Sequence, residues 1–307
     1  MILVIGDLIL DNFSINKIQR KSPEANVPII KNYELINRIG GAGNVANNIN
    51  KIDKSCILIS RIGKNINDKI LVKLINENKI KNKLFYEKNF SVGKKIRFFI
   101  NNNQKFRLDE EIISKIKKKT EKRIVNYIKK NLKRFSLLIV SDYKKGLISK
   151  NLFKEISKLF LKEKKIIITN PKQQDMRYYS NSTIIVPNEK EFDSFFKRNL
   201  KFSSKIEIFF KRSKIENLII TRGKKKLLFF NKEKKKISFN VKKIKSFDVT
   251  GASDTFMAFL GIFLKRDIDL ITSIKIAILA ATKVVTKNYT EIITRFELKG
   301  ILKDIKF

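Results

Sequence analysis

The chain begins with Ile2-Leu3-Val4-Ile5-Gly6-Asp7, four apolar residues in a row that end at a Gly-Asp pair. A short apolar run without polar alternation is typical of a strand that is buried on both faces. Similar runs recur along the chain, and longer segments with a helical pattern lie between them. Buried strands that alternate with helices predict an α/β fold, with a doubly wound, mainly parallel sheet flanked by helices.

The other predicted strands are Ile57–Ile59, Leu137–Val140, Ile166–Thr169, Ile184–Val186, Leu218–Thr221 and Leu227–Phe230. The predicted helices between them are Asn44–Lys51, Asp68–Asn78, Thr120–Leu132, Asn151–Glu163 and Glu189–Lys197. Sheets of this type bind ligands beyond the carboxyl ends of their strands. We therefore expect the functional residues in the segments that directly follow the strands.

Two segments, 12–38 and 90–108, interrupt this alternation with strand-like sequence. In the second one, Phe98–Ile100 and Lys105–Leu108 flank the triplet Asn101-Asn102-Asn103, a pattern that predicts a hairpin. We expect the two segments to form a small antiparallel β flap, or lid, over the site. The whole chain, residues 1–307, is then expected to be a single domain.

The composition excludes several kinds of chemistry. The 307 residues are 43% hydrophobic, which is enough for a sizeable core. The chain has no histidine and a single cysteine, Cys56, so Ser-His-Asp and Cys-His catalysis, histidine metal sites and an internal disulfide are excluded. No apolar run approaches the roughly 18 residues of a membrane span. Any catalysis must depend on carboxylates, lysines, arginines, hydroxyl groups and backbone amides.

The net charge of +39, from 68 Lys and Arg against 29 Asp and Glu, first suggests a nucleic-acid partner. The basic residues are mostly lysines, however, and they are spread along a chain that is also rich in Ile and Asn. This is the signature of a very AT-rich genome. We therefore expect solvated lysines and no nucleic-acid partner, with a functional polyanion surface as the alternative. In both cases the charge favours anionic small substrates.

Glycine is scarce, with 11 residues in the chain, yet three of them lie in Gly40-Gly41-Ala42-Gly43-Asn44 before a predicted helix. Glycines at a helix start let backbone amides approach a ligand closely. Asn44 offers both a donor and an acceptor to a polyol. The spacing matches neither a P-loop nor the dinucleotide fingerprint. A tight turn that caps the helix is an equally open interpretation of these residues.

A second motif, Asp248-Val249-Thr250-Gly251-Ala252-Ser253-Asp254-Thr255, precedes the apolar run Phe256–Leu264, a predicted buried helix. Gly251 to Asp254 then lie at a helix N-terminus, where free amides and the helix dipole can hold an anion. A carboxylate at this place could take the proton of an acceptor hydroxyl during phosphoryl transfer. The alternative is that Asp254 only caps the helix.

In combination, the Gly6-Asp7 strand end, the glycine cluster at 40–44 and the motif at 248–254 resemble the ribokinase-type (PfkB) carbohydrate kinases. Five finer motifs resemble the heptose 7-phosphate kinases within them. These are Ser22-Pro23-Glu24-Ala25-Asn26-Val27-Pro28, Arg107-Leu108-Asp109-Glu110-Glu111, Ser141-Asp142-Tyr143-Lys144-Lys145-Gly146, Asn170-Pro171-Lys172 and Pro187-Asn188-Glu189-Lys190-Glu191-Phe192. The resemblance spans nearly the whole chain in the same order.

The resemblance implies a role for each matching residue. Asp254 would be the general base, and the amides of Gly251, Ala252 and Ser253 would form an anion hole. The residues implied for the sugar are Asp11, Gly40, Gly41 and Asn44, and those implied for the nucleotide are Asn188, Glu191, Thr221, Gly223 and Asp248. Asn188 and Glu191 would also contact a magnesium ion, through water.

Three cations, Lys95, Arg97 and Arg107, lie on the expected flap. Because cationic side chains, and guanidinium groups above all, suit phosphate, we assign these three to a substrate phosphate, with ordinary exposed charges as the alternative.

The implied reaction is ATP-dependent phosphorylation of the anomeric hydroxyl of D-glycero-D-manno-heptose 7-phosphate, which gives the 1,7-bisphosphate for ADP-heptose and lipopolysaccharide core synthesis. ATP and Mg²⁺ would be the cofactors, and the cytoplasm the location. The resemblance also suggests a homodimer through the flap. Because the chain ends at Phe307, we expect no nucleotidyltransferase domain.

Three residues depart from the family pattern. Ser253 stands where the family has glycine, Asn170 where it has Asp before Pro-Lys, and Asn65 where Asp often follows the turn at Gly63. The Ser253 side chain would take up room near the transferred phosphate. Two alternatives to the heptose kinase therefore stay open, namely a ribokinase-type kinase of another sugar and a catalytically impaired binding protein.

Overall fold

The computed structural model describes residues 1–16, 20–25, 27–29, 33–101, 103–196, 200–242, 250–287 and 289–303. Within these residues a nine-stranded sheet has the order β15-β14-β13-β12-β11-β10-β1-β6-β7. Its strands are β1 (Ile2–Gly6), β6 (Cys56–Ile62), β7 (Asn82–Tyr86), β10 (Leu137–Ser141), β11 (Ile166–Asn170), β12 (Ile184–Ile185), β13 (Asn217–Ile220), β14 (Leu227–Asn231) and β15 (Lys236–Phe239). Only the β13–β14 and β14–β15 pairs are antiparallel, which confirms the predicted mainly parallel sheet.

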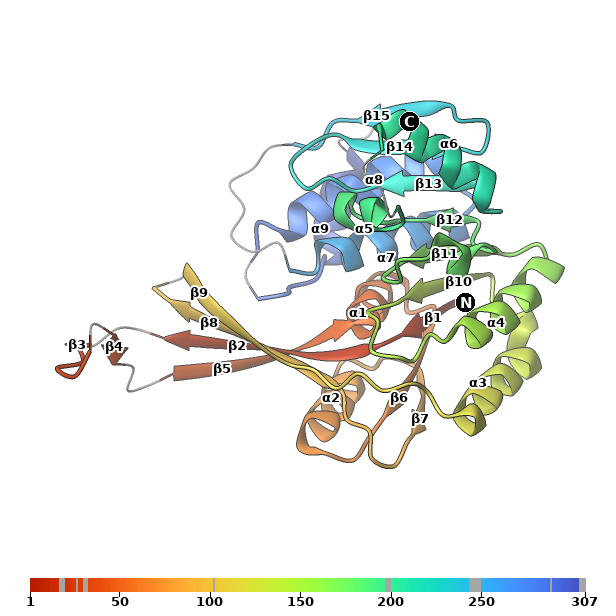
Figure 1. Cartoon of the computed structure of the whole chain (residues 1–307). Helices are drawn as coiled ribbons and strands as arrows, with labels where there is room; N and C mark the ends of the chain where they lie inside the picture. Colours follow the sequence, from red (N-terminus) through yellow and green to blue (C-terminus); the bar gives the residue numbers. More distant parts are fainter. Residues whose placement is uncertain are drawn as a thin grey trace.

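Helices cover both faces of this sheet (Figure 1). On one face lie α1 (Ala42–Asp53), α2 (Ile66–Glu77), α7 (Ala252–Lys265), α8 (Leu270–Val284) and α9 (Arg295–Lys303). On the other lie α3 (Lys118–Asn131), α4 (Lys150–Lys162), α5 (Glu189–Ser194) and α6 (Phe202–Arg212). The first strand feeds both layers, since Ile2 and Val4 join one apolar cluster while Leu3 and Ile5 join the other. Burial on both faces explains why this strand has no polar alternation.

A second sheet, called the flap below, has the strand order β5-β2-β8-β9 and projects from the body (Figure 1). Its strands are β2 (Leu8–Asn16), β5 (Tyr33–Gly41), β8 (Gly93–Ile100) and β9 (Asn103–Glu110), and the short pair β3 (Arg20–Lys21) and β4 (Pro28–Ile29) lies at its tip. The antiparallel β8–β9 pair confirms the predicted hairpin. The expectation of a purely antiparallel flap was wrong, because β2 and β8 are parallel.

The parallel pair has a topological cause. Between β5 and β8 the chain returns to the body and forms α1, β6, α2 and β7. Strand β8 therefore leaves the body in the same direction as β2. Only Asp7 separates β1 from β2, so the flap starts at the carboxyl end of the first central strand. This junction places the base of the flap at the edge of the sheet where ligands are expected.

No helix in the described ranges is long and apolar enough to cross a membrane.

Candidate active site

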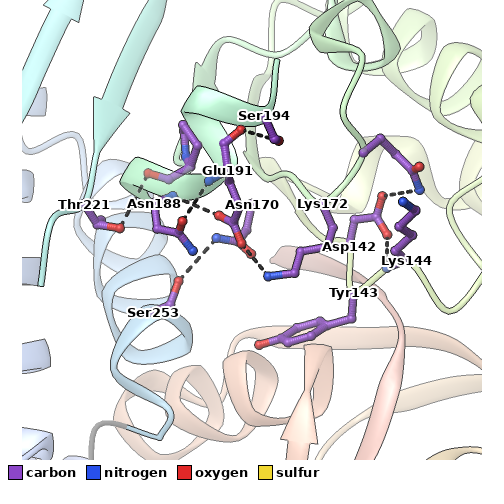
Figure 2. Close-up of polar contacts among 12 residues, drawn as sticks. Asp142, Tyr143, Lys144, Asn170, Lys172, Asn188, Glu191, Ser194, Thr221 and Ser253 are labelled. Carbon is purple, nitrogen blue, oxygen red and sulfur yellow. Dashed lines mark hydrogen bonds and ion pairs between the residues drawn. The ribbon is translucent and has the colours of Figure 1, made fainter. Parts of the chain in front are cut away.

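The carboxyl ends of the central strands bring together polar residues from distant parts of the chain. Asp142 and Tyr143 follow β10, Asn170 ends β11, Asn188 follows β12 and Thr221 follows β13. Figure 2 shows these side chains around the start of α7, which contributes Ser253. The candidate residues named from sequence after these strands therefore lie near one another at one edge of the sheet.

Gly251 is the N-cap residue directly before helix α7 and has a φ of 81°. A Cβ atom at this position would lie 2.9 Å from Nδ2 of Asn44. Glycine is thus required both by the left-handed backbone and by the close approach of α1. The backbone amides of Gly251, Ala252 and Ser253 lie in the first turn of α7, where amides have no partner within the helix.

The Asp254 carboxylate lies in the same turn and is 7% exposed. Its Oδ1 accepts a hydrogen bond from the Tyr143 hydroxyl at 2.7 Å, and its Oδ2 accepts one from Nδ2 of Asn44 at 2.9 Å. Asp254 thus lies in the first turn, where a capping residue would also lie, but both of its carboxylate oxygens accept hydrogen bonds from side chains of other elements.

The pKa of Asp254 is raised to about 6. Burial is the main cause, and the nearby Asp11 carboxylate also raises it. The hydrogen bonds from Tyr143 and Asn44, and the charge of Lys95, act in the opposite direction. A carboxylate with this pKa is mostly ionised at neutral pH but is a much better proton acceptor than an exposed one.

Asn44 and the glycine cluster connect the helix start to the flap. Nδ2 of Asn48, one turn along α1, donates to the backbone oxygen of Asn44 at 3.0 Å and to its Oδ1 at 3.2 Å. This contact turns Nδ2 of Asn44 toward Asp254. A Cβ atom on Gly40 would lie 2.4 Å from Oδ2 of Asp11, which gives the glycine cluster its steric reason.

The inner face of the flap carries the charged residues singled out from sequence. Arg97 is buried and pairs with Asp11 at 2.8 Å. Arg107 is exposed and pairs with Asp109 at 2.7 Å. Lys95 has no ion-pair partner among the described residues, and its ammonium nitrogen lies 5.7 Å from the centre of the Tyr143 ring. Burial lowers the pKa of Lys95.

Of the three flap cations singled out from sequence, Lys95 is the one without an ion-pair partner among the described residues, and it is called the excess cation below. The Lys95 ammonium lies near the Tyr143 ring, and the Tyr143 hydroxyl donates to Asp254, so the base of the flap and the start of α7 are adjacent. A half-buried ammonium group without an ion-pair partner is a ready contact for an anionic ligand.

On the other side of α7 lies a cavity of about 320 Å³. Its apolar walls come from β14, α7 and α8, and are formed by Leu227, Phe256, Ile278, Ala281 and Val285. Thr221, Gly223, Ala252 and Ser253 also line it, so three sequence-predicted segments meet there. The cavity is large enough for a flat heterocycle and opens onto the first turn of α7.

Asn188 and Glu191 form a reciprocal cap at the start of α5. The Asn188 amide donates to Oε2 of Glu191 at 2.8 Å, and the Glu191 amide donates to Oδ1 of Asn188 at 2.9 Å. Oε1 of Glu191 also pairs with the Lys172 ammonium (Figure 2). Both carboxylate oxygens are thus engaged by the protein. A metal ion near them would be reached through water.

No cluster of three or more acidic, histidine or cysteine side chains suited to a metal occurs within the described ranges. Magnesium bound together with a nucleotide is held mainly by phosphate oxygens and water, with one or two protein contacts. A single carboxylate, that of Glu191, which already contacts protein groups, is compatible with a magnesium ion that arrives with the nucleotide. It does not provide the set of ligands that a permanently bound ion would need.

Two of the departures from the family pattern contact each other. Nδ2 of Asn170 donates to Oγ of Ser253 at 3.2 Å, as Figure 2 shows. The Ser253 hydroxyl is therefore held by the end of β11. Asn65 forms a reciprocal cap with Asp68 at the start of α2, a role that an aspartate could also fill.

Sequence reasoning missed two residues of the site and placed one that lies outside the described residues. Tyr143 and Lys172 were quoted as parts of motifs but received no role, since neither a tyrosine nor a lysine is unusual in such segments. Their contacts with Asp254 and Glu191 depend on the fold and leave no local signal. Asp248 lies outside the described residues.

The sequence model of the pfkB family of carbohydrate kinases matches residues 1–295. The protein named bifunctional protein HldE of Geobacter sulfurreducens is 30% identical over 305 residues, which cover 98% of this chain and 62% of that protein. The protein of the same name from Aliarcobacter butzleri is 32% identical over 291 residues, which cover 93% of this chain and 61% of that protein. The chain thus spans about three fifths of the length of these curated relatives.

Solved structures show the same fold. Phosphofructokinase-2 from Escherichia coli in complex with potassium superposes with a TM-score of 0.78 at 14% identity, over 99% of this chain and 97% of that one. Ribokinase from Arabidopsis thaliana complexed with ribose and ATP gives a TM-score of 0.74 at 15% identity, over 98% of both chains.

Proposed function

Because the chain belongs to the pfkB family of carbohydrate kinases, we propose that it transfers the γ-phosphoryl group of ATP to the anomeric hydroxyl of D-glycero-D-manno-heptose 7-phosphate. The product would be the 1,7-bisphosphate, used in ADP-heptose and lipopolysaccharide core synthesis. Membership of the family makes the chain a sugar kinase, a phosphotransferase that acts on an alcohol group. The choice of ATP and of the heptose is the proposal.

The observation that carries the mechanism is the buried Asp254 carboxylate in the first turn of α7, where the first backbone amides have no partner within the helix itself. In the proposed mechanism Asp254 accepts the proton of the acceptor hydroxyl as that oxygen attacks the γ-phosphorus. The amides of Gly251, Ala252 and Ser253 stabilise the negative charge of the transferred group. These groups supply positioning and charge neutralisation, which are most of what phosphoryl transfer requires.

The nucleotide would enter the cavity on the far side of α7. Its apolar walls, among them Leu227 and Phe256, suit the adenine ring, and Thr221 and Gly223 also line the cavity. Asn188 and Glu191 would contact the hydrated magnesium ion that accompanies ATP and offsets its phosphate charge. Asp248 keeps its sequence-based assignment to the nucleotide.

The sugar would lie between α7 and the flap. Asp11, Asn44 and the backbone at Gly40 and Gly41 would bind its hydroxyl groups, as the resemblance implies, and the contacts of Gly40 with Asp11 and of Asn44 with Asp254 support this placement. Lys95, which lacks an ion-pair partner among the described residues, would bind the 7-phosphate together with Arg107. Arg97 is already paired with Asp11, so it would act by fixing that carboxylate as well as by adding positive charge.

The heptose is chosen over other sugars because five motifs along the chain resemble heptose 7-phosphate kinases and because the excess cation on the flap suits a substrate that carries a phosphate. Matches to proteins named HldE extend over at least 93% of the chain and support the same choice. The two alternatives are a kinase for another sugar and a catalytically impaired binding protein. The Ser253 hydroxyl, which contacts Asn170, bears on the second alternative, because Ser253 stands where the family has glycine.

An ADP-release assay with ATP and Mg²⁺ tests the proposal. We expect heptose 7-phosphate to give the highest kcat/KM, with ribose, fructose 6-phosphate and adenosine at least about tenfold lower. A higher kcat/KM with a different sugar would support the kinase activity but contradict the assignment of heptose 7-phosphate as the substrate. No sugar-dependent ADP release from any of these acceptors, in a protein shown to be folded, would favour the binding protein.

A homodimer through the flap is also proposed. Leu35, Phe106 and Leu108 on its outer face are each at least 50% exposed, and the Phe98 and Phe106 rings stack 4.2 Å apart there. An apolar sheet face of this kind is typical of an interface. Light scattering should give twice the chain mass, and Phe106→Glu should give the monomer. A monomeric parent at micromolar concentration would contradict the dimer.

A further inference from the structure

Tyr143 contacts the carboxylate that the proposed mechanism uses, although it lies on a different element. Its hydroxyl donates to Oδ1 of Asp254 at 2.7 Å, while Asn44 donates to Oδ2 at 2.9 Å. The two donors approach from the segment after β10 and from α1. The carboxylate is therefore held from both sides, and its plane is fixed relative to the helix start.

The position of Tyr143 is itself fixed by the end of the first strand. Its backbone amide donates to Oδ2 of Asp7 at 3.1 Å, and the amide of Lys145 donates to the same oxygen at the same distance. The amide of Leu147 donates to Oδ1 of Asp7. The buried Asp7 thus anchors the whole turn that carries the tyrosine, so the contact with Asp254 is built into the fold.

The charged groups that face this pair come from several elements. Asp11 on β2 and Lys95 on β8 both act on the pKa of Asp254, in opposite directions. Glu191 on α5 and Asp11 act on Tyr143. Burial, followed by the Asp254 carboxylate, raises the pKa of Tyr143 well above its ordinary value. The hydroxyl therefore stays protonated and remains a donor at every pH at which the protein would work.

The flap reaches the same tyrosine from its open side. The Lys95 ammonium lies 5.7 Å from the centre of the Tyr143 ring, within the range of a cation–π contact. Tyr143 thus lies between the excess cation of the flap and the buried carboxylate, and contacts both.

We infer that Tyr143 is a positioning residue that holds Asp254 in orientation and keeps it ionised inside a buried site. The consequence for turnover rests on the proposed kinase function, whereas the effect on the carboxylate does not. A hydrogen bond to the charged form of an acid stabilises that form. Removal of the hydroxyl leaves burial and Asp11 without this counterweight.

The test is the variant Tyr143→Phe, which keeps the ring and removes only the hydroxyl. We expect the acidic limb of the kcat/KM profile to move up by about one pH unit, the size expected for one hydrogen bond to a charged group. The loss of activity should then be about fivefold greater at pH 6 than at pH 9. Tyr178→Phe is the matched control, because its hydroxyl donates to the backbone oxygen of Ile148 and does not contact Asp254.

A second measurement does not depend on the substrate. The side-chain carboxyl carbon of Asp254, labelled with ¹³C and identified by its absence in Asp254→Asn, should titrate at a higher pH in Tyr143→Phe than in the parent. An unchanged titration midpoint in folded Tyr143→Phe would overturn the inference, as would an equal loss of activity at every pH. If no sugar is phosphorylated by the parent, the kinase proposal fails while the titration still decides the role of Tyr143.

Discussion

Two buried aspartates at the carboxyl edge of the sheet have similar surroundings but different partners. Burial raises the pKa of both Asp7, after β1, and Asp254, in α7. Asp7 accepts hydrogen bonds from three backbone amides of the segment 143–147. Asp254 accepts them from two side chains, Tyr143 and Asn44, beside the first turn of a helix.

Under the proposed function, this difference in donors distinguishes a structural carboxylate, Asp7, from a catalytic one, Asp254. Backbone donors cannot move away without unfolding the turn that they belong to. The hydrogen bonds of Asp7 therefore hold the 143–147 segment in place. Side-chain donors can shift, and Asp254 follows directly on Ser253, which lines the large cavity. Burial and a raised pKa alone would therefore not identify the base. In the proposed mechanism, Asp254 is distinguished as the base by its side-chain donors and by the cavity next to Ser253.

The strongest test of this contrast is Asp254→Asn. We expect kcat to fall by at least about 10²-fold, because the amide cannot accept the proton of the acceptor hydroxyl. Circular dichroism and the unfolding midpoint should stay close to those of the parent. Full activity of this variant would show that another group is the base.

Asp7→Ala should lower the stability of the fold, which Asp254→Asn should leave nearly unchanged. Three buried backbone amides would lose their acceptor, so the free energy of unfolding should fall by about 3 kcal/mol or more. Urea denaturation followed by fluorescence measures this loss. A loss below about 1 kcal/mol would mean that Asp7 does not anchor the 143–147 segment.

The pH profile sharpens the contrast further. Because the pKa of Asp254 is raised to about 6, its basic form is present above that pH and is lost as the pH falls through it. Activity should fall about tenfold for each pH unit below 6. Burial also raises the pKa of Asp142 to about 6, so the same profile is needed for Asp142→Asn. The limb should remain in that variant; its disappearance there would assign it to Asp142.

A smaller effect is expected on the flap. Arg107→Ala should raise KM for the sugar phosphate by about five- to tenfold and leave KM for ATP unchanged. Arg177→Ala is the matched control, since Arg177 is also exposed and also pairs with an aspartate two residues away. Equal effects of the two substitutions on KM would mean that Arg107 acts only as one more surface charge.

The smallest effect is expected for Ser253→Gly. Since Nδ2 of Asn170 donates to the Ser253 hydroxyl, we expect that hydroxyl to be held away from the transferred phosphate. The rate should change by no more than about threefold in either direction. A rise of more than about tenfold in kcat would show that the serine impairs the chain.

Much of the fold followed from the sequence because buried parallel strands leave continuous apolar runs. All seven predicted strands lie in the main sheet. The helix expected over 189–197 ends earlier, at Ser194. The parallel contact between β2 and β8 could not be predicted, because the body segment between β5 and β8, which forms α1, β6, α2 and β7, determines the direction in which β8 leaves the body.

The candidate site was predictable where the chain shows rare residues in dense motifs. The glycines at 40–43 and the segment 250–254 meet through the Asn44–Asp254 contact. The contacts that side chains make across different elements left no recognisable motif in the sequence. The Arg97–Asp11 pair and the contact of Tyr143 with Asp254 arise only when the flap and the central strands are brought together.

The most direct test of the central claim is a crystal structure with a non-hydrolysable ATP analogue and heptose 7-phosphate. The terminal phosphate should lie against the amides of Gly251 to Ser253, and the anomeric oxygen of the sugar should lie within hydrogen-bonding distance of the Asp254 carboxylate. A terminal phosphate bound away from the start of α7, or a sugar whose anomeric oxygen points away from Asp254, would contradict the account.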